Sequence, residues 1–238
     1  APTVMGFARA GTGLPDYLAM TRLAADRFQL EWLVILVVPG DFVEGFQPRV
    51  GKYHWSSTQP GDTELTPDDR RRSDTRRWVR SLALVHYLKG HLGVSLHDLL
   101  FPAKVSPGSS HCRPAGLEPG DDRIIEGFVA ALPGAAKLPA SRIILVFDPD
   151  LHPGTDGRGL RGGRSACDTR DNTARAQLQA RARQAGLQVV DMKEAFEAYY
   201  RRTGERIDYA DSHWNAAGHR LAAQAVSRIL TGPAQEGN

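Results

Sequence analysis

The apolar run Trp32–Val38 constrains the fold of this chain more than any other feature of its sequence. All seven of its residues are hydrophobic, and several of them are β-branched. A strand without a polar face has to be buried on both sides, which is typical of a parallel sheet covered by helices. Two further strand-like runs, Arg142–Phe147 and Leu187–Asp191, follow along the chain. The sequence therefore predicts strands that lie inside a parallel sheet.

Helical stretches alternate with these runs. Gly186 is a stop signal for one predicted helix, and Asn215 is a favourable N-cap for the last one. A short first strand is predicted over Pro2–Phe7. Strands that alternate with helices indicate an α/β fold, in which helices cover both faces of the sheet. The predicted helices are Pro15–Phe28, Trp78–Leu92, Asn172–Ala185, Met192–Arg202 and Asn215 to about Leu230.

The length of 238 residues is enough for one sizeable core. No internal repeat and no linker divides the sequence, so we expect a single domain over residues 1–238. Loops of more than about 15 residues within a compact domain are usually functional or disordered. Three such loops, rich in Gly, Pro, Arg and Ser, are expected at Glu44–Asp74, Phe101–Asp122 and Asp148–Asp171.

The charge pattern gives little support to a nucleic-acid partner. The formal net charge is +3, and acidic residues interrupt the basic run Arg70–Arg77. We interpret that run as a solvated loop and helix start, with a site for an anionic polymer as the alternative. No apolar run approaches the length of a membrane span. No signal peptide is visible, and the sequence opens at Ala1 without a Met, so a preceding segment is left open.

The cysteines and most histidines show no metal-binding pattern. Cys112 and Cys167 lie in separate loop segments, outside any Cys-x-x-Cys motif. They form either one disulfide, which would indicate an exported protein, or two unrelated free thiols. The histidines lack the spacing of a zinc site. We therefore expect no metal and no cofactor.

The segment Asp211–His219 carries the strongest sign of chemistry. Asp211 lies two residues before His213 in a short polar loop. In an extended backbone residues i and i+2 point the same way. The carboxylate can then accept a hydrogen bond from one imidazole nitrogen, while the other nitrogen takes a proton from a nucleophile. The alternative is a capping aspartate beside a surface histidine.

Residues 211–223, Asp-Ser-His-Trp-Asn-Ala-Ala-Gly-His-Arg-Leu-Ala-Ala, resemble the last sequence block of the SGNH (GDSL-type) hydrolase superfamily. Its members have flavodoxin-like three-layer α/β/α folds and cleave or transfer acyl esters with a Ser–His–Asp arrangement. The aspartate lies two residues before the histidine, and this spacing is similar to that in the branch that includes polysaccharide O-acetyltransferase-like proteins. The resemblance implies that His213 is the general base and Asp211 its orienting acid. It also makes Trp214 a candidate substrate-binding residue.

Two upstream segments resemble further blocks of the same superfamily. Val4–Gly13 is similar to a strand that ends in a glycine turn, and Gly11 matches a position whose N–H helps to bind an oxyanion. A plain strand-to-helix turn is the alternative. In the next block Gly40 replaces the usual Asn, and Asp41 matches the usual Asp. The lost amide donor corresponds to about 3 kcal/mol of transition-state stabilisation. Backbone near Gly40 is then assigned to oxyanion binding and Asp41 to substrate binding.

The Gly-Asp-Ser block that carries the nucleophile in this superfamily does not occur in the 238 residues. Gly6–Ala8 could be a degenerate form of it. Other serines lie in loops rather than in the strand–turn–helix context that holds a nucleophile rigidly. These are Ser56, Ser57, Ser106, Ser109, Ser110 and Ser165.

Two functional hypotheses follow from the sequence. The first is an acyl-ester hydrolase or O-acyltransferase, periplasmic or secreted, that acts on an acylated small molecule or polysaccharide. Its serine would lie N-terminal to Ala1, and an upstream segment or a second chain would complete the sheet. The second hypothesis is a non-catalytic binding or scaffold module of the same fold.

Overall fold

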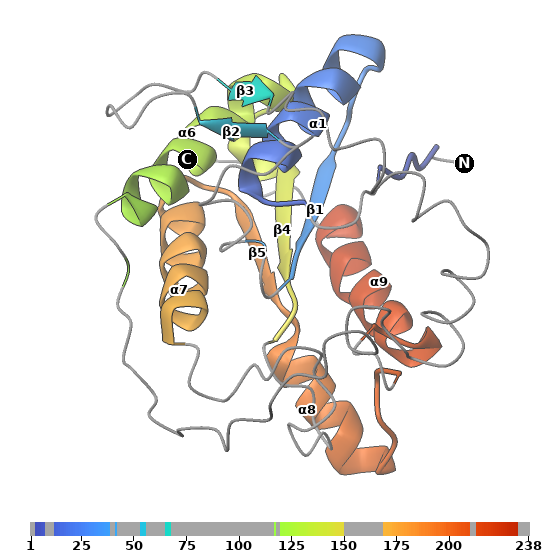
Figure 1. Ribbon diagram of the computed structural model, residues 1–238. Coiled ribbons are helices and arrows are strands. Elements are labelled where there is room, and N and C mark those ends of the chain that lie inside the picture. Colours follow the sequence, from blue (N-terminus) through green and yellow to red (C-terminus); the bar gives the residue numbers. More distant parts are fainter. Residues whose placement is uncertain are drawn as a thin grey trace, which may run out of the picture.

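The computed structural model describes the backbone of residues 3–7, 12–38, 41, 53–55, 65–67, 117, 120–149, 169–209 and 213–232. Helices and strands alternate along most of this part of the chain (Figure 1). In chain order the elements are α1 (Leu14–Arg27), β1 (Leu33–Val37), β2 (Tyr53–Trp55), β3 (Leu65–Pro67), α6 (Asp121–Ala136), a 3-10 turn (Ala140–Arg142), β4 (Ile143–Phe147), α7 (Thr169–Gln184), β5 (Gln188–Asp191), α8 (Met192–Thr203) and α9 (Ala216–Thr231).

The main sheet consists of three parallel strands in the order β1-β4-β5. Leu145 at the centre of β4 lies opposite Ile35 of β1 and Val189 of β5. All five residues of β4 are buried. The apolar runs therefore form a parallel sheet, and the predicted α/β class is confirmed. The prediction that the strand within Trp32–Val38 is buried on both faces is wrong, because Val34 and Leu36 of β1 are exposed on one face.

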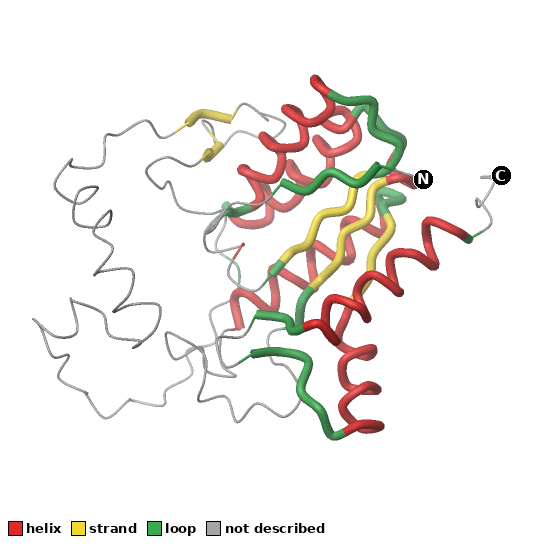
Figure 2. Tube along the Cα trace, turned by 90° about the vertical axis from the view of Figure 1, so that its right-hand side faces the viewer, coloured by secondary structure: helices red, strands yellow, loops and turns green. Residues whose placement is uncertain are grey.

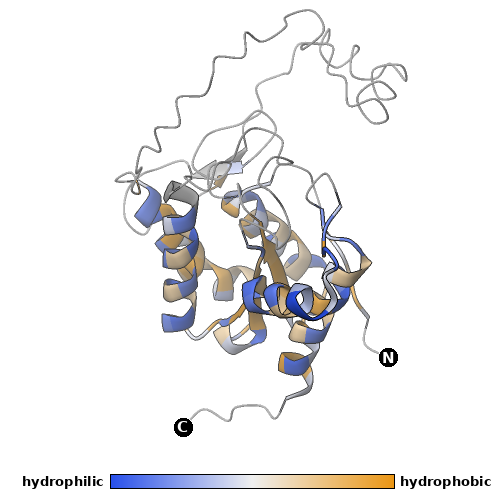
Figure 3. Cartoon of the chain, turned by 90° about the horizontal axis from the view of Figure 1, so that it is seen from below, coloured by the Kyte–Doolittle hydropathy of each residue, from blue (hydrophilic) through white to orange (hydrophobic). Residues whose placement is uncertain are grey.

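Successive residues of β4 enter two different cores, because side chains alternate between the faces of a strand. Ile143, Leu145 and Phe147 pack with residues of α1, α6 and α7. Ile144 and Val146 pack with residues of α8 and α9. Figure 2 shows the strands between helices on both sides. Figure 3 shows apolar strands inside and polar helix faces outside. The described part is thus a three-layer α/β/α arrangement.

The start of α1 is held by the side chain of Asp16. Its Oδ2 accepts from the backbone N–H of Gly13 at 3.2 Å, and its Oδ1 accepts from the N–H of Tyr53 at 3.1 Å. The second bond attaches β2 to the first turn of α1. β2 and β3 pair antiparallel as a separate two-stranded sheet. The prediction of a long loop over Glu44–Asp74 is wrong at these two strands.

Other predicted boundaries also need correction. Residues 3–7 form no strand, since no described strand supplies ladder hydrogen bonds to this segment and its residues are exposed. Helix α6 was not predicted, and its first residues overlap the loop expected at Phe101–Asp122. Helix α7 begins inside the loop expected at Asp148–Asp171. The helix predicted at Trp78–Leu92 and both cysteines lie outside the described residues.

Candidate active site at the carboxyl end of the sheet

An aspartate lies at or after the end of each strand of the parallel sheet. Asp148 directly follows β4, Asp191 is the last residue of β5, and Asp41 follows β1 after a short turn. The backbone N–H of Asp148 donates to the carbonyl of Val37 at 3.0 Å and so extends the ladder between β4 and β1. Ligand sites of open α/β sheets lie beyond this edge. The candidate site is therefore sought at the carboxyl end of the sheet.

Asp41 holds the turn after β1. It is buried, and its Oδ2 accepts from the N–H of Val38 and from the hydroxyl of Tyr17, each at 2.7 Å. Because Tyr17 belongs to α1, this carboxylate joins the beginning of that helix to the end of β1. A contact between Asp41 and a substrate stays a prediction, and Gly40 lies outside the described residues.

The first turn of α1 is linked to the same edge of the sheet through Tyr17. Thr12 and Gly13 are buried at the start of the helix, and the carbonyl of Gly13 accepts from the N–H of Tyr17 at 3.1 Å. Gly11 itself lies outside the described residues, so its role at an oxyanion stays a prediction. Tyr17, in the first turn of the helix, contacts Asp41 after the end of β1.

Trp214 anchors the loop before α9 to the end of β4. Its indole Nε1–H donates to Asp148 Oδ1 at 2.7 Å, in a buried contact between residues 66 apart in sequence. The ring also meets Phe196 of α8 edge-on, with centroids 5.4 Å apart. Only 8% of Trp214 is exposed, so the structure gives the indole an anchoring role, and its predicted substrate contact stays untested. Sequence analysis missed Asp148, although an acid directly after a buried strand was the available signal.

The first turn of α9 is capped as the sequence predicts. The side-chain oxygen of Asn215 accepts from the N–H groups of Ala217 and Gly218 at 2.9 and 3.1 Å. Its amide nitrogen donates to the carbonyl of Arg206 at 2.8 Å. Such a cap satisfies N–H groups that have no partner inside the helix. One side chain thus fixes both the start of α9 and the strand-like segment that runs beside it.

Gly218 allows this helix start to pack closely. A Cβ at this position would lie 2.7 Å from the carbonyl oxygen of Ile207 and 3.0 Å from the Cβ of Trp214. No side chain fits there without moving backbone. The glycine in the Asp-x-His-Trp-Asn-x-x-Gly string is therefore explained by packing of the helix against the anchored loop. His219, the next residue, meets the Trp214 ring edge-on at 5.7 Å.

His213 is exposed to solvent immediately before the buried Trp214. Its carbonyl accepts from the N–H of Tyr209 at 2.8 Å, which fixes the backbone on both sides of the loop. The structure thereby brings the predicted base to the end of the sheet through the Trp214–Asp148 contact. Asp211 lies outside the described residues, so its pairing with His213 stays a prediction.

A charged network closes the end of β5. Asp191 accepts from Arg175 at 2.6 Å, from Gln179 at 3.0 Å and from the N–H of Lys193 at 3.0 Å. Burial alone would raise the pKa of this carboxyl, but the bonds from Lys193 and Gln179 and the Arg175 charge together hold the pKa below its ordinary value. Asp191 also caps α8. These contacts give the network a structural function.

Comparisons with protein-family models, with curated proteins and with solved structures find no match to this chain. None of the described helices combines the length and apolar character needed to cross a bilayer. Within the described residues, no group of three or more His, Cys, Asp and Glu side chains is arranged to hold a metal ion.

Proposed function

We propose that this chain supplies the base half of an SGNH-like acyl-ester hydrolase or O-acyltransferase. The observation that carries the proposal is the anchor between Trp214 and Asp148, with Nε1 and Oδ1 2.7 Å apart. It attaches the exposed His213 to the carboxyl end of a parallel sheet, where α/β folds bind their ligands. The resemblance of residues 211–223 to the superfamily's last block indicates that the chemistry at this site is acyl transfer.

In this proposal His213 moves the protons of an acyl transfer. The imidazole takes the proton of a serine hydroxyl while the serine oxygen attacks the ester carbonyl carbon. It then gives that proton to the departing alkoxide. Asp211 orients the ring and stabilises its charged form. Backbone N–H groups at Gly11 and near Gly40 stabilise the oxyanion, without the amide donor that the superfamily commonly uses.

The serine is assigned to polypeptide outside these 238 residues, in an upstream segment or a second chain. The edge of β1 supports this assignment. Among the described strands β1 pairs only with β4, so its other edge has no described partner strand. On one face of β1, Val34 and Leu36 are also 45% and 39% exposed. An unpaired apolar edge is a template for a further strand. A parallel strand added there would end at the same edge of the sheet as Asp41 and Asp148.

The acyl group is proposed to be carried by a small molecule or a polysaccharide, and the protein to be periplasmic or secreted. Both assignments rest on the resemblance to the Asp-x-His-Trp branch. Exposure of His213 is compatible with a large substrate, because a polymer has to reach the base from solvent.

The test is hydrolysis of 4-nitrophenyl acetate by the protein as its gene encodes it. We expect His213→Ala to lower kcat/KM by about 10²- to 10⁴-fold, the usual contribution of a general base. His219→Ala is the matched control, since it removes a neighbouring imidazole on α9, and it should retain activity. Equal activity of the wild type and His213→Ala would refute the proposal. An inactive wild type would instead favour the non-catalytic module, which the absence of Gly-Asp-Ser from these residues also favours.

A further inference from the structure

The loop that carries His213 is closed by a short antiparallel ladder. Asp208 and Trp214 lie directly opposite each other in it. Two backbone hydrogen bonds of 2.8 Å flank this pair, one from Asn215 N to Ile207 O and one from Tyr209 N to His213 O. The second bond makes Tyr209 and His213 the next opposite pair along the ladder.

The register of this ladder decides which side chains are neighbours. Side chains alternate between the two faces of a strand, and opposite residues share a face. Asp208 and Trp214 are 6% and 8% exposed and occupy the buried face. Tyr209 and His213 therefore share the outer face. Opposite residues in an antiparallel pair have Cβ atoms about 4.5–5.5 Å apart, so the side chains of Tyr209 and His213 leave the backbone at neighbouring positions.

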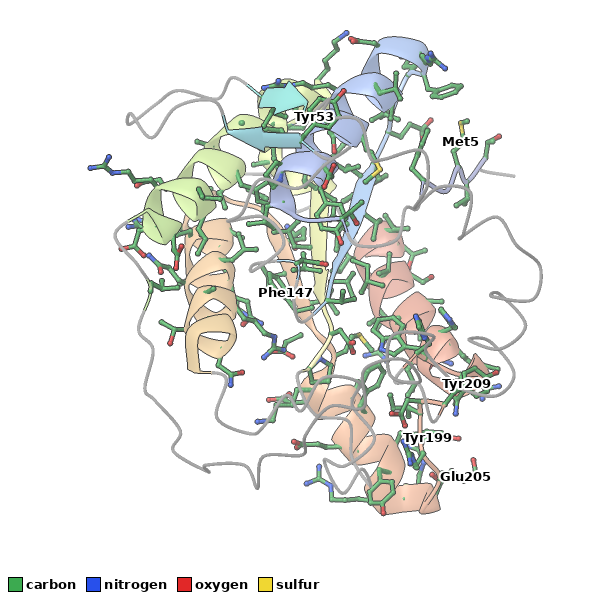
Figure 4. The ribbon with its side chains drawn as sticks, viewed as in Figure 1. Met5, Tyr53, Phe147, Tyr199, Glu205 and Tyr209 are labelled. Atoms are coloured by element: carbon green, nitrogen blue, oxygen red, sulfur yellow. The ribbon has the colours of Figure 1, made fainter. Side chains whose placement is uncertain are left out.

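Tyr209 is open to solvent at this position. Its exposed fraction is 58%, and its hydroxyl makes no hydrogen bond to another residue of the described part of the chain. In Figure 4 it lies outside the core, beyond the end of β4 that Phe147 marks. Tyr199 differs, because its hydroxyl donates to Glu205 at 2.7 Å and its ring lies under the guanidinium of Arg202. Among the described residues, Tyr199 therefore has partners for both its hydroxyl and its ring, whereas Tyr209 has none for its hydroxyl.

We propose that Tyr209 binds the sugar ring of an acylated carbohydrate beside His213. This inference rests on the proposed function and names the chemistry of its substrate. A pyranose has an apolar C–H face and a polar rim, and an exposed phenol ring offers a matching flat face and a hydroxyl. Stacking on Tyr209 would hold the sugar while the ester on its rim lies within reach of the imidazole. A small nitrophenyl ester has no sugar ring and does not need this contact.

The experiment compares two substrates of the full-length protein, 4-nitrophenyl acetate and a partially O-acetylated xylo-oligosaccharide. We expect Tyr209→Leu to raise KM for the oligosaccharide about fivefold and to leave kcat unchanged, because stacking acts equally on the ground and transition states. Kinetics with nitrophenyl acetate should not change. Tyr209→Phe should restore most of the binding, and Tyr199→Phe should behave as the wild type with both substrates.

The outcomes separate this inference from the proposed function. If His213→Ala abolishes hydrolysis but Tyr209→Leu leaves KM for the oligosaccharide unchanged, the role of Tyr209 is refuted and the acyl-transfer site stands. Equal losses with both substrates would mean that Tyr209 is only structural. A wild type that hydrolyses nitrophenyl acetate but not the acetylated oligosaccharide also overturns the inference. If His213→Ala retains full activity, both proposals fail.

Discussion

The contact between Trp214 and Asp148 should be worth several kcal/mol of unfolding free energy. In Trp214→Phe an aromatic ring remains beside Phe196, but the N–H that donates to Asp148 over 2.7 Å is lost. A hydrogen bond to a charged group contributes about 1.5–3 kcal/mol. The smaller ring buries less apolar surface, which adds roughly 1 kcal/mol. We therefore expect a loss of about 3 kcal/mol, or a fall in Tm of about 6–12 °C for a domain of this size.

Urea unfolding followed by far-UV circular dichroism measures this loss. Thr231→Val is a suitable control, because it removes an exposed side-chain hydrogen bond to the carbonyl of Ser227 near the end of α9. It should change the unfolding free energy by less than about 0.5 kcal/mol. The midpoint of Trp214→Phe should be clearly lower than that of both the control and the wild type.

A double-mutant cycle with Asp148→Asn tests whether the two side chains act together. Asparagine keeps an acceptor oxygen, so the single change leaves a weaker, neutral hydrogen bond and should cost about 1 kcal/mol at this contact. Once Trp214 is Phe, that cost should disappear. The double variant should thus lose less than the sum of the single losses by about 1 kcal/mol. Additive losses, or a Trp214→Phe protein as stable as the wild type, would refute the anchor.

Two further predictions concern the same end of the sheet. Gly218→Ala should lower stability by about 1–3 kcal/mol in thermal unfolding, because the new Cβ meets the carbonyl of Ile207 at 2.7 Å. Gly134→Ala, in open space on α6, should be neutral or stabilising. The lowered pKa of Asp191 means that its contribution to stability is complete above the ordinary value of 3.8 and is lost as the pH falls through the folded-state pKa. The stability difference between wild type and Asp191→Asn, from urea midpoints, should therefore be larger at pH 7 than at pH 3, and an equal difference would contradict this.

The elements that sequence analysis found are those whose signal is local. The run Trp32–Val38 contains β1, as its continuous apolar and β-branched character predicts, but only the face that carries Ile35 and Val37 is buried. Asn215 caps α9 because its side chain reaches N–H groups two and three residues ahead. Helix α6 was missed because Pro133 and Gly134 interrupt its pattern, although Ile125, Phe128, Val129 and Leu132 share one buried face.

The features that sequence analysis missed depend on contacts between distant segments. The N–H of Tyr53 binds Asp16 across 37 positions, and nothing local marks β2 as a strand. The family resemblance made Trp214 a candidate substrate-binding residue. Its burial depends on Asp148, 66 positions away. Tyr209 was not considered, since its position opposite His213 follows only from the register of the ladder.

In this ladder side chains alternate between a buried face and an outer face. The contact that stabilises the loop therefore also decides that His213 faces solvent. The side chain that anchors the loop and the side chain that faces solvent are adjacent residues, so burying Trp214 necessarily turns His213 outward. The opposite strand obeys the same rule, with Asp208 inside and Tyr209 outside. A variant that loosens the anchor therefore releases both outer side chains together. Loss of the Trp214–Asp148 bond should then lower His213-dependent turnover and oligosaccharide binding in parallel, whereas Tyr209→Leu should lower binding alone.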